Sequence, residues 1–523
     1  MPEGERTQVL IAGAGPVGLA LAIELGLRGI GCVLAERGDG VLRVPKMSSV
    51  SARGMEFCRR WGIADRVRYA IWSRTHAADF VYTSTMVGEE LARLRIGSYA
   101  EREGRLDYSP EGAASCPQIY FDPILAETAR SVPKVAVRYR TRLESFDQDA
   151  AGVRARLVEP DSGRETAIAA DYLVGCDGAG GIVRRRLGIP LDGPGTIATS
   201  VNVFFRSAEL AAINTKGWAH IYRFFDDAGC WAELIAIDGK ELWRLSVYHD
   251  PEPDLTGQTY LLKLAGRDFR FEILDVSPWE RRDHVARAYR RGRVFIAGDA
   301  AHEMSPTAGA GMHTGICEAV NLAWKLAAVL EGWGGPRLLD SYEAECRPVA
   351  QDYVALSTHM FNSISALPGA EGFRDMVAAD GGVPGRLSPP GRRKAEIAYA
   401  DSPICVPDGT ATRDPDAPGQ SARPGTRAPH CWIGEGRSTL DLFGGGFVLV
   451  RFGAAGRDAD PAPLVSAASA RGVPLEIADV ESAEAAALYG RPLALVRPDG
   501  HVAWRGEALP DDAGALIDCV RGA

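Results

Sequence analysis

The stretch TQVLIAGAGPVGLALAIELGLRG, residues 7–29, has the pattern of a β-strand, a glycine turn and an apolar helix. Gly13, Gly15 and Gly18 fit the G-x-G-x-x-G pattern of a nucleotide-binding turn. Gly13 permits the tight turn, Gly15 lets a pyrophosphate approach the backbone, and Gly18 lets helix and strand pack closely. The next strand, within GCVLAERG, ends at Glu36, whose carboxylate can accept hydrogen bonds from ribose hydroxyls. The stretch therefore predicts a Rossmann-like α/β domain that binds a dinucleotide.

Length and composition set the class of protein. The 523 residues are too many for one ordinary domain, so two or three are expected. A net charge of −9 without a basic stripe argues against nucleic acid as a partner. No apolar stretch is long enough to span a membrane and the first strand leaves no room for a signal peptide, so we expect a cytoplasmic protein. The ten cysteines lack metal-ligand spacing, which predicts reduced thiols and no metal site.

A second glycine motif lies in the middle of the chain. In VGCDGAGGIVRRRLG, residues 174–188, Asp177 and Gly178 close a strand, and three arginines follow. By itself this pattern is typical of an ordinary turn before a solvated basic helix.

A third motif lies in FIAGDAAHEMSPTAGAGMHTG, residues 295–315. Asp299 stands at a strand end, where its carboxylate can accept a hydrogen bond from a sugar-alcohol hydroxyl. Gly309 and Gly311 let the backbone pass close to a flat ring. The helix that follows directs its positive end toward that ring, which favours an anion there by about 0.3–1 kcal/mol.

Together the three motifs resemble those of the flavoprotein monooxygenases of the p-hydroxybenzoate hydroxylase type, which are single-component, FAD-dependent aromatic hydroxylases. The resemblance implies that the N-terminal turn holds the ADP end of FAD and that residues 295–315 hold its ribityl chain and isoalloxazine ring. Two further segments carry it, RVPKMSSVSARGMEFCRRWGI from Arg43 and CPQIYFDPIL with Gln118. The cofactor-binding residues that it implies are Gly13, Gly15, Pro16, Gly18, Glu36, Arg37, Arg43, Gln118, Asp177, Gly178, Asp299, Pro306, Gly309, Gly311 and Met312.

The same resemblance divides the chain. Residues 1–75, 104–190 and 285–387 would form the FAD-binding domain. Residues 76–103 and 191–284, which are rich in alternating apolar and aromatic residues, would form an inserted antiparallel-sheet domain for the substrate. The proline- and glycine-rich segment 388–429 reads as a linker or an extended arm. Residues 430–523, with STLDLFGGGFVLV and LVRPDGHVAWR, resemble the thioredoxin-like domain of phenol hydroxylase and of aromatic-polyketide hydroxylases.

The implied activity is hydroxylation of an electron-rich aromatic or polycyclic substrate, with a natural product as one class, at the expense of NADPH or NADH and dioxygen. Oxygen transfer would proceed through a flavin hydroperoxide, so no catalytic acid or base is assigned. His302 and His313 are interpreted as packing or hydrogen-bonding residues. Trp218, Trp231 and Trp243 are predicted to be core, with one or two as alternatives for the wall of a substrate pocket. A monomer and a homodimer both stay open.

Three alternatives stay open at this point. The first is a flavin-dependent oxidase or reductase acting on a quinone or an antibiotic. The second is a flavin-dependent halogenase, which the missing Trp-x-Trp-x-Ile-Pro signature disfavours. The third is a catalytically silent FAD-binding redox sensor. One departure from the family pattern bears on the site, because Gly309-Ala310-Gly311-Met312-His313 replaces the more usual Gly-Gln-Gly-Met-Asn.

Overall fold

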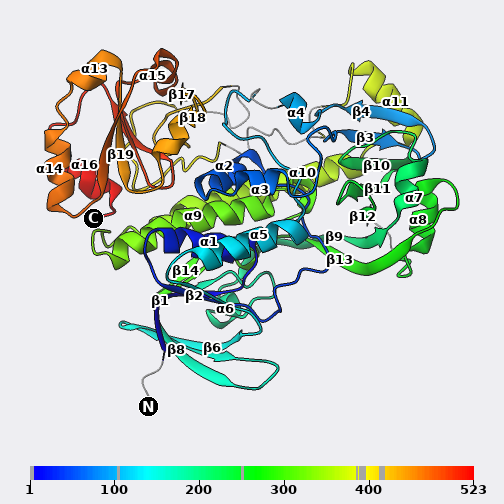
Figure 1. Ribbon diagram of the computed structural model, residues 1–523, viewed down its shortest axis with the longest axis horizontal. Coiled ribbons are helices and arrows are strands. Elements are labelled where there is room, and N and C mark those ends of the chain that lie inside the picture. Colours follow the sequence, from blue (N-terminus) through cyan, green and yellow to red (C-terminus); the bar gives the residue numbers. More distant parts are fainter. Residues whose placement is uncertain (1–4, 103–105, 249–252, 385–386, 388–395, 412–418) are drawn as a thin grey trace.

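The computed structural model describes residues 5–102, 106–248, 253–384, 387, 396–411 and 419–523. It is a mixed α/β structure of three parts, with a parallel sheet and its helices at the centre and bottom of Figure 1, a second large sheet at the right, and the C-terminal unit at the upper left. Within the part of the chain that the structure describes, no helix is long and apolar enough to cross a membrane.

The first sheet has the strand order β14-β15-β8-β1-β2-β5. Strand β1 (Glu5–Ala12) lies parallel between β2 (Cys32–Ala35) and β8 (Glu165–Gly175), and β15 (Val294–Ile296) is parallel to β8 on its other side. Their apolar runs are buried, as expected for strands that are covered on both faces. Because neighbouring parallel strands end at one edge, the segments after β1, β8 and β15 meet there. The three motifs that lie far apart in sequence are thus brought together.

Helices and a hairpin complete this first part. Helix α1 (Pro16–Leu27) packs against both α5 (Gln118–Ser131) and α9 (Gly311–Leu330). The hairpin of β6 (Arg142–Asp149) and β7 (Gly152–Val158) joins this sheet, because β7 pairs antiparallel with β8. The remaining elements are α2 (Ala52–Arg60), α3 (Ala64–Arg68), β5 (Val135–Arg138), α6 (Ile182–Arg186), β14 (Arg290–Arg291), η1 (Gly298–Ala300), η2 (Pro306–Ala308) and α10 (Ser341–Ser365).

The second sheet has the order β16-β13-β9-β12-β11-β10-β3-β4. Its elements are β3 (Phe80–Thr83), β4 (Glu90–Leu94), α4 (Tyr99–Arg102), β9 (Leu191–Arg206), β10 (Ile221–Asp226), β11 (Gly229–Ala236), β12 (Leu242–Tyr248), β13 (Glu272–Ala286), β16 (His302–Glu303) and α11 (Ala370–Ala379). The predicted antiparallel pairing is confirmed with one exception, since β3 runs parallel to β10. The exception arises because β3 comes from the earlier segment 76–103, so no hairpin joins it to β10.

One face of the second sheet carries an apolar core under helices α7 (Ala208–Ile213) and α8 (Gln258–Ala265). Trp243 is fully buried in this core and stacks on Trp218 with ring centroids 5.4 Å apart. Trp231 is partly buried against the same cluster. The prediction of a core position is confirmed for Trp243, whereas Trp218 and Trp231 are only partly buried against that core. The opposite face of the sheet packs against residues of the first part of the molecule.

The C-terminal unit is a four-stranded sheet of order β20-β19-β21-β22 with helices on both sides, which is the thioredoxin-like arrangement predicted. Its elements are β17 (Trp432–Gly434), β18 (Arg437–Ser438), η4 (Thr439–Leu442), β19 (Phe447–Phe452), α13 (Gly453–Asp458), α14 (Ala462–Ala470), β20 (Leu475–Val480), α15 (Ala483–Tyr489), β21 (Leu493–Val496), β22 (Val502–Gly506) and α16 (Ala513–Val520). All ten cysteines of the molecule are free thiols, as expected.

The segment 388–429, predicted as a linker or an extended arm, is anchored at some of its described residues, while others, such as Ala398 and Asp401, are exposed. Ile397 and Tyr399 are buried in the core of the first part, and Ile404 is buried in a core shared with the C-terminal unit. Its described residues form only isolated bridges, such as Ala398 with Thr426. The segment is therefore an extended arm that fastens the C-terminal unit to the rest of the molecule.

Buried His220 makes a testable contribution to the pH dependence of stability. Its Nε2 lies 3.1 Å from the Ser48 hydroxyl, and burial lowers its pKa to about 3. The unfolded chain takes up a proton below pH 6.5 whereas the folded chain does not, so stability is full above pH 6.5 and falls as the pH drops. Relative to His220→Gln, the native protein should lose about 1.4 kcal/mol of unfolding free energy between pH 7.5 and 5.5. Urea denaturation at both pH values measures this, and an unchanged difference would contradict it.

Candidate active site

The three motifs meet along the carboxyl edge of the first sheet. The backbone N–H of Cys176 donates to the carbonyl of Ala12 at 2.8 Å, and that of Ala297 donates to Gly175 at 3.0 Å. These bonds continue the parallel pairing into the turns themselves. Each turn is therefore held in register with the next.

The glycines of the first turn have two different reasons to be glycine. Gly13 has a φ of 103°, and a Cβ there would lie 2.3 Å from the carbonyl oxygen of Cys176. A Cβ on Gly18 would lie 2.0 Å from the carbonyl oxygen of Gly13. A Cβ on Gly15, in contrast, would meet no atom of the described residues within 4 Å. Protein packing requires Gly13 and Gly18, whereas Gly15 borders open space.

That open space fits a pyrophosphate. Helix α1 begins at Pro16, directly after Gly15, and no side chain caps its first turn. Uncapped amides at a helix N-terminus form a ready site for an anion. The residues present therefore suit the phosphates of a dinucleotide.

Glu36 has a role in the structure that the sequence did not show. Its carboxylate accepts from the backbone N–H of Ala14 at 2.9 Å and from that of Gly38 at 2.7 Å. It thereby ties the end of β2 to the glycine turn. The nearby Arg37 is exposed, and Arg43 is 71% exposed and forms an ion pair with Asp39 at 2.7 Å.

Asp299 lies in η1, directly after Gly298, whose φ is 63°. Its carboxylate hydrogen-bonds to none of the described residues, and its side chain is open to solvent. Desolvation by the surrounding protein nevertheless raises the pKa of Asp299, although the charges of His302 and Lys46 act to lower it. The exposed carboxylate, which no described residue engages in a hydrogen bond, is free to accept from a ligand hydroxyl.

A buried pair behind this turn was missed by sequence reasoning. Glu318, on α9, accepts from the backbone N–H of Gly298 at 2.8 Å and lies 3.2 Å from the His302 ring nitrogen. The charge of Glu318 raises the pKa of His302, although burial alone would lower it. The hydrogen-bonding interpretation of His302 is confirmed. An acid within the apolar stripe of α9 is the signal that points to Glu318.

The third turn leads from Pro306 into α9. Gly309 has a φ of 58° and is exposed, and α9 begins at Gly311 without a side-chain cap. Met312 is partly buried in the first turn of the helix. Backbone groups and a helix N-terminus are thus exposed or near the surface at this turn, where the sequence predicts that the flavin binds.

Gln118 and Asp177 are engaged within the protein. The Gln118 side chain donates to Asp122 at 3.0 Å. Burial raises the pKa of Asp122 to about 7, although this hydrogen bond and the charge of Lys46 both act to lower it. Asp177 accepts from the backbone N–H of Val183 at 3.0 Å, so it anchors the start of α6. Its other carboxylate oxygen is buried and has no hydrogen-bond partner among the described residues. The adjoining Gly178 has a φ of 78° and open space at its Cβ position.

The second sheet presents a polar strip on the face opposite its helices. Arg281 is buried there and donates to the hydroxyls of Ser200 at 2.9 Å and Ser305 at 3.1 Å. It forms no ion pair within the described chain, and burial lowers its pKa. Other members of this inner strip are Asn202, Arg244 and Ser246. Sequence reasoning missed the strip, although strand alternation against the apolar core points to it.

Arg281 joins the strip to the third turn, because Ser305 directly precedes η2. Arg244 joins it at another point by donating to the carbonyls of Pro45 and Lys46 at 2.7 and 2.9 Å. The strip therefore lies beside the third turn and the segment after Arg43. No cluster of potential metal ligands occurs among the described residues.

Asp299→Ala tests whether the Asp299 carboxylate contacts the ribityl chain of FAD. The substitution removes a charge-assisted hydrogen bond to a ligand hydroxyl, a loss of about 1.5–3 kcal/mol. FAD affinity should therefore fall at least about tenfold, which a fluorescence titration of the apoprotein measures. Unchanged affinity would show that Asp299 does not face the ribityl chain.

Comparisons with known proteins agree with this geometry. A family model described as "FAD binding domain" matches residues 6–357, and one described as "Aromatic-ring hydroxylase, C-terminal" matches residues 421–521. A "Putative polyketide hydroxylase" of Streptomyces halstedii is 35% identical over 96% of this chain and 94% of its own length. Aklavinone 12-hydroxylase RdmE of Streptomyces purpurascens is 34% identical over 98% of this chain and 97% of its own length.

Two solved structures are similar over the whole molecule. RebC with bound 7-carboxy-K252c superposes with a TM-score of 0.92 and is 37% identical, with 99% of this chain and 100% of RebC covered. Aklavinone-11 hydroxylase in complex with FAD and aklavinone has a TM-score of 0.84 and is 30% identical, with both chains covered in full. The chain belongs to the family of FAD-dependent aromatic-ring hydroxylases.

Proposed function

We propose that this FAD-dependent monooxygenase binds its cofactor along the three turns and hydroxylates a polycyclic aromatic substrate held between the inner strip and η2. The observation that carries the proposal is the convergence of the turns after β1, β8 and β15 at one edge, with the inner strip beside the third. Bound FAD supplies the redox chemistry, which takes electrons from NAD(P)H and transfers one atom of dioxygen to the ring.

The chain's own residues bind and orient the cofactor. Gly15 and the first amides of α1 would receive the pyrophosphate, because no protein atom fills that space. Asp299 would accept from the ribityl chain with its free carboxylate. The first turn of α9 would direct positive potential at the isoalloxazine, where it favours negative charge by about 0.3–1 kcal/mol.

The inner strip suggests the chemistry of the substrate. Arg281 is a buried cation without an acidic partner in the described chain, and a buried charge of this kind is costly unless something compensates it. An ionised phenol or a carboxylate on the substrate would do so. RebC binds 7-carboxy-K252c and aklavinone-11 hydroxylase binds aklavinone, which supports a polycyclic substrate here.

Substrate-dependent consumption of NAD(P)H tests this function. The holoprotein should oxidise NAD(P)H slowly alone and faster with a suitable polycyclic phenol, and mass spectrometry should find product carrying one added oxygen. Phenols and their carboxylated counterparts should be compared, because the strip favours the anion. If no aromatic changes the rate and all electrons appear in hydrogen peroxide, the oxidase alternative is correct.

A further inference from the structure

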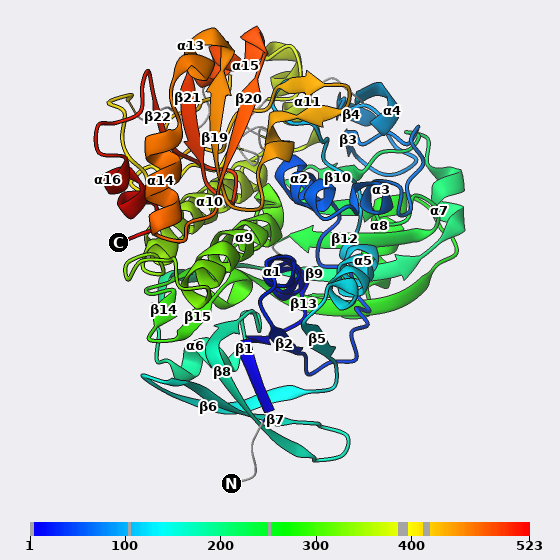
Figure 2. The same cartoon turned by 60° about the vertical axis from the view of Figure 1, so that its left-hand side comes forward.

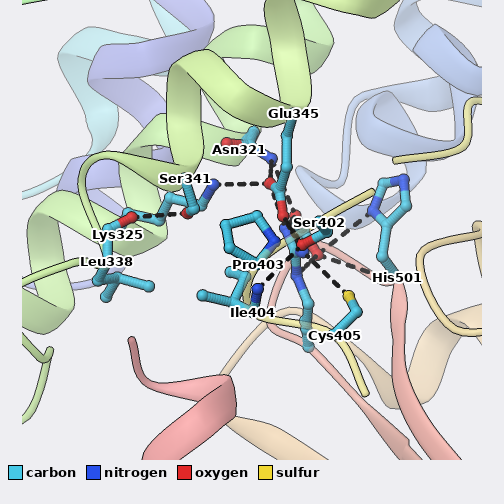
Figure 3. A network of polar contacts seen from close by, with 12 residues as sticks. Asn321, Lys325, Leu338, Ser341, Glu345, Ser402, Pro403, Ile404, Cys405 and His501 are labelled. Atoms are coloured by element: carbon cyan, nitrogen blue, oxygen red, sulfur yellow. Dashed lines mark hydrogen bonds and ion pairs between the residues drawn. The ribbon is translucent and has the colours of Figure 1, made fainter. Parts of the chain in front are cut away.

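A buried network of charges joins the C-terminal unit to the cofactor-binding part. Arg497, in the turn between β21 and β22, is fully buried and donates to both carboxylate oxygens of Glu345 at 2.5 and 2.9 Å. It also donates to Asp499 at 2.6 Å. Glu345 lies on α10, so a single guanidinium connects two parts of the molecule. Figure 3 shows Glu345 at the centre of this network, with Ser402, Cys405 and His501 around it.

The network also holds α9. On this helix, Asn321 donates to Glu345 at 2.7 Å and Lys325 donates to the same carboxylate at 2.6 Å. The Trp324 indole N–H lies 3.3 Å from Asp499. Figure 2 shows the C-terminal sheet standing over α9 and α10. The turn between β21 and β22 is thus linked to the C-terminal half of α9 directly through Asp499 and indirectly through Glu345.

The same turn reaches α2. The carbonyl of Asp499 accepts from Arg53 at 3.0 Å, and Arg53 forms an ion pair with Glu56 at 2.8 Å. Glu56 pairs also with Arg427 of the extended arm. All of these side chains are buried, so none of the charges is screened by solvent.

The contacts of α9 continue to the Gly298–Asp299 turn, where we propose that the ribityl chain of the flavin binds. Glu318 lies less than one turn before Asn321 and accepts from the backbone N–H of Gly298. A Cβ on Gly315 would come within 3.0 Å of the Gly298 Cα, which shows how closely α9 lies against this turn. A helix is rigid over this distance, so a shift of Asn321 moves Glu318 and Gly298 with it.

Burying so much charge is a poor way to gain stability, since well-packed apolar residues stabilise as much or more. A satisfied polar network instead fixes a unique geometry. We propose that Arg497 is a positioning residue for the cofactor. From its place in the C-terminal unit, Arg497 fixes the position of α9 and, through α9, the position of the Gly298–Asp299 turn. The inference rests on the proposed place of the flavin along residues 298–312.

The test is FAD binding by Arg497→Met, with Arg505→Met as the matched control. Arg505 lies in the same unit and pairs with Asp408 at 2.6 Å, but no described contact links it to α9 or α10. Arg497→Met should weaken FAD binding at least tenfold and change the visible circular dichroism of the bound flavin. Arg505→Met should lower the melting temperature while leaving both unchanged.

A second variant keeps the test decisive if Arg497→Met fails to fold. Glu345→Gln keeps the volume and one acceptor while it removes the charge, and it should weaken FAD binding in the same direction. If the variant that folds melts at a lower temperature but binds FAD with native affinity and spectrum, the network is only structural and the proposal is wrong. Asp299→Ala serves as the reference: if it too leaves FAD affinity unchanged, the proposed cofactor site is what fails.

Discussion

The Gly15→Val variant should purify as a folded protein without bound FAD. Gly15 borders open space at the start of α1, so valine meets no protein atom within 4 Å at its Cβ position and the apoprotein can fold. The side chain would instead occupy the place of the pyrophosphate, where only a bare backbone lets a phosphate approach. Flavin absorbance per mole of protein and circular dichroism in the far ultraviolet measure both halves of this expectation.

Gly445→Val is the control for that experiment. Gly445 also offers space, with a side-chain oxygen of Glu476 3.9 Å away, but it lies in the C-terminal unit. The control should keep its FAD. Full flavin occupancy in Gly15→Val would mean that this turn does not hold the cofactor's phosphates.

Arg281→Met should leave FAD bound but lower kcat/KM about ten- to a hundredfold, because a hydrogen bond to a charged group contributes about 1.5–3 kcal/mol. Methionine keeps much of the packing against Phe361, whose ring centre lies 4.6 Å from the guanidinium. Substrate-stimulated NAD(P)H oxidation, measured once a substrate is in hand, gives the ratio. The charge of Arg281, rather than its volume, is what this variant removes.

The adjacent residue provides the control. Arg282 is about half exposed and pairs with Glu280 at 2.7 Å, so it faces away from the inner strip. Arg282→Met should retain nearly native turnover. Equal turnover in the two variants would place the substrate elsewhere.

The fold and the main turns could be predicted because their signals are local. Glycines at fixed spacing, a strand before them and an apolar helix after them determine the turn at Gly13 without reference to the rest of the chain. The order of the three motifs, each at the end of a strand, then indicates a shared sheet edge. The resemblance supplied the division of the chain, which stays a prediction in its boundaries.

The remaining features could not be predicted because they depend on which faces meet in three dimensions. Arg497 and Glu345 are 152 residues apart, and nothing near either one indicates the other. Arg281 lacks an ionic partner among the described residues, which depends on what the folded chain brings beside β13. The role of Asp177 could not be predicted either. Its local pattern did not reveal that one carboxylate oxygen anchors α6 and that the other has no hydrogen-bond partner among the described residues.

Incubation with labelled dioxygen tests directly whether this protein transfers one oxygen atom from dioxygen to an aromatic substrate. The holoprotein, NAD(P)H and the polycyclic phenol that most stimulates NAD(P)H oxidation should be incubated under labelled oxygen gas, and the product analysed by mass spectrometry. We expect one labelled oxygen atom in each product molecule and none when the label is supplied in water. Product oxygen that comes from water, or label that is recovered only in hydrogen peroxide and water with every aromatic tested, would contradict it.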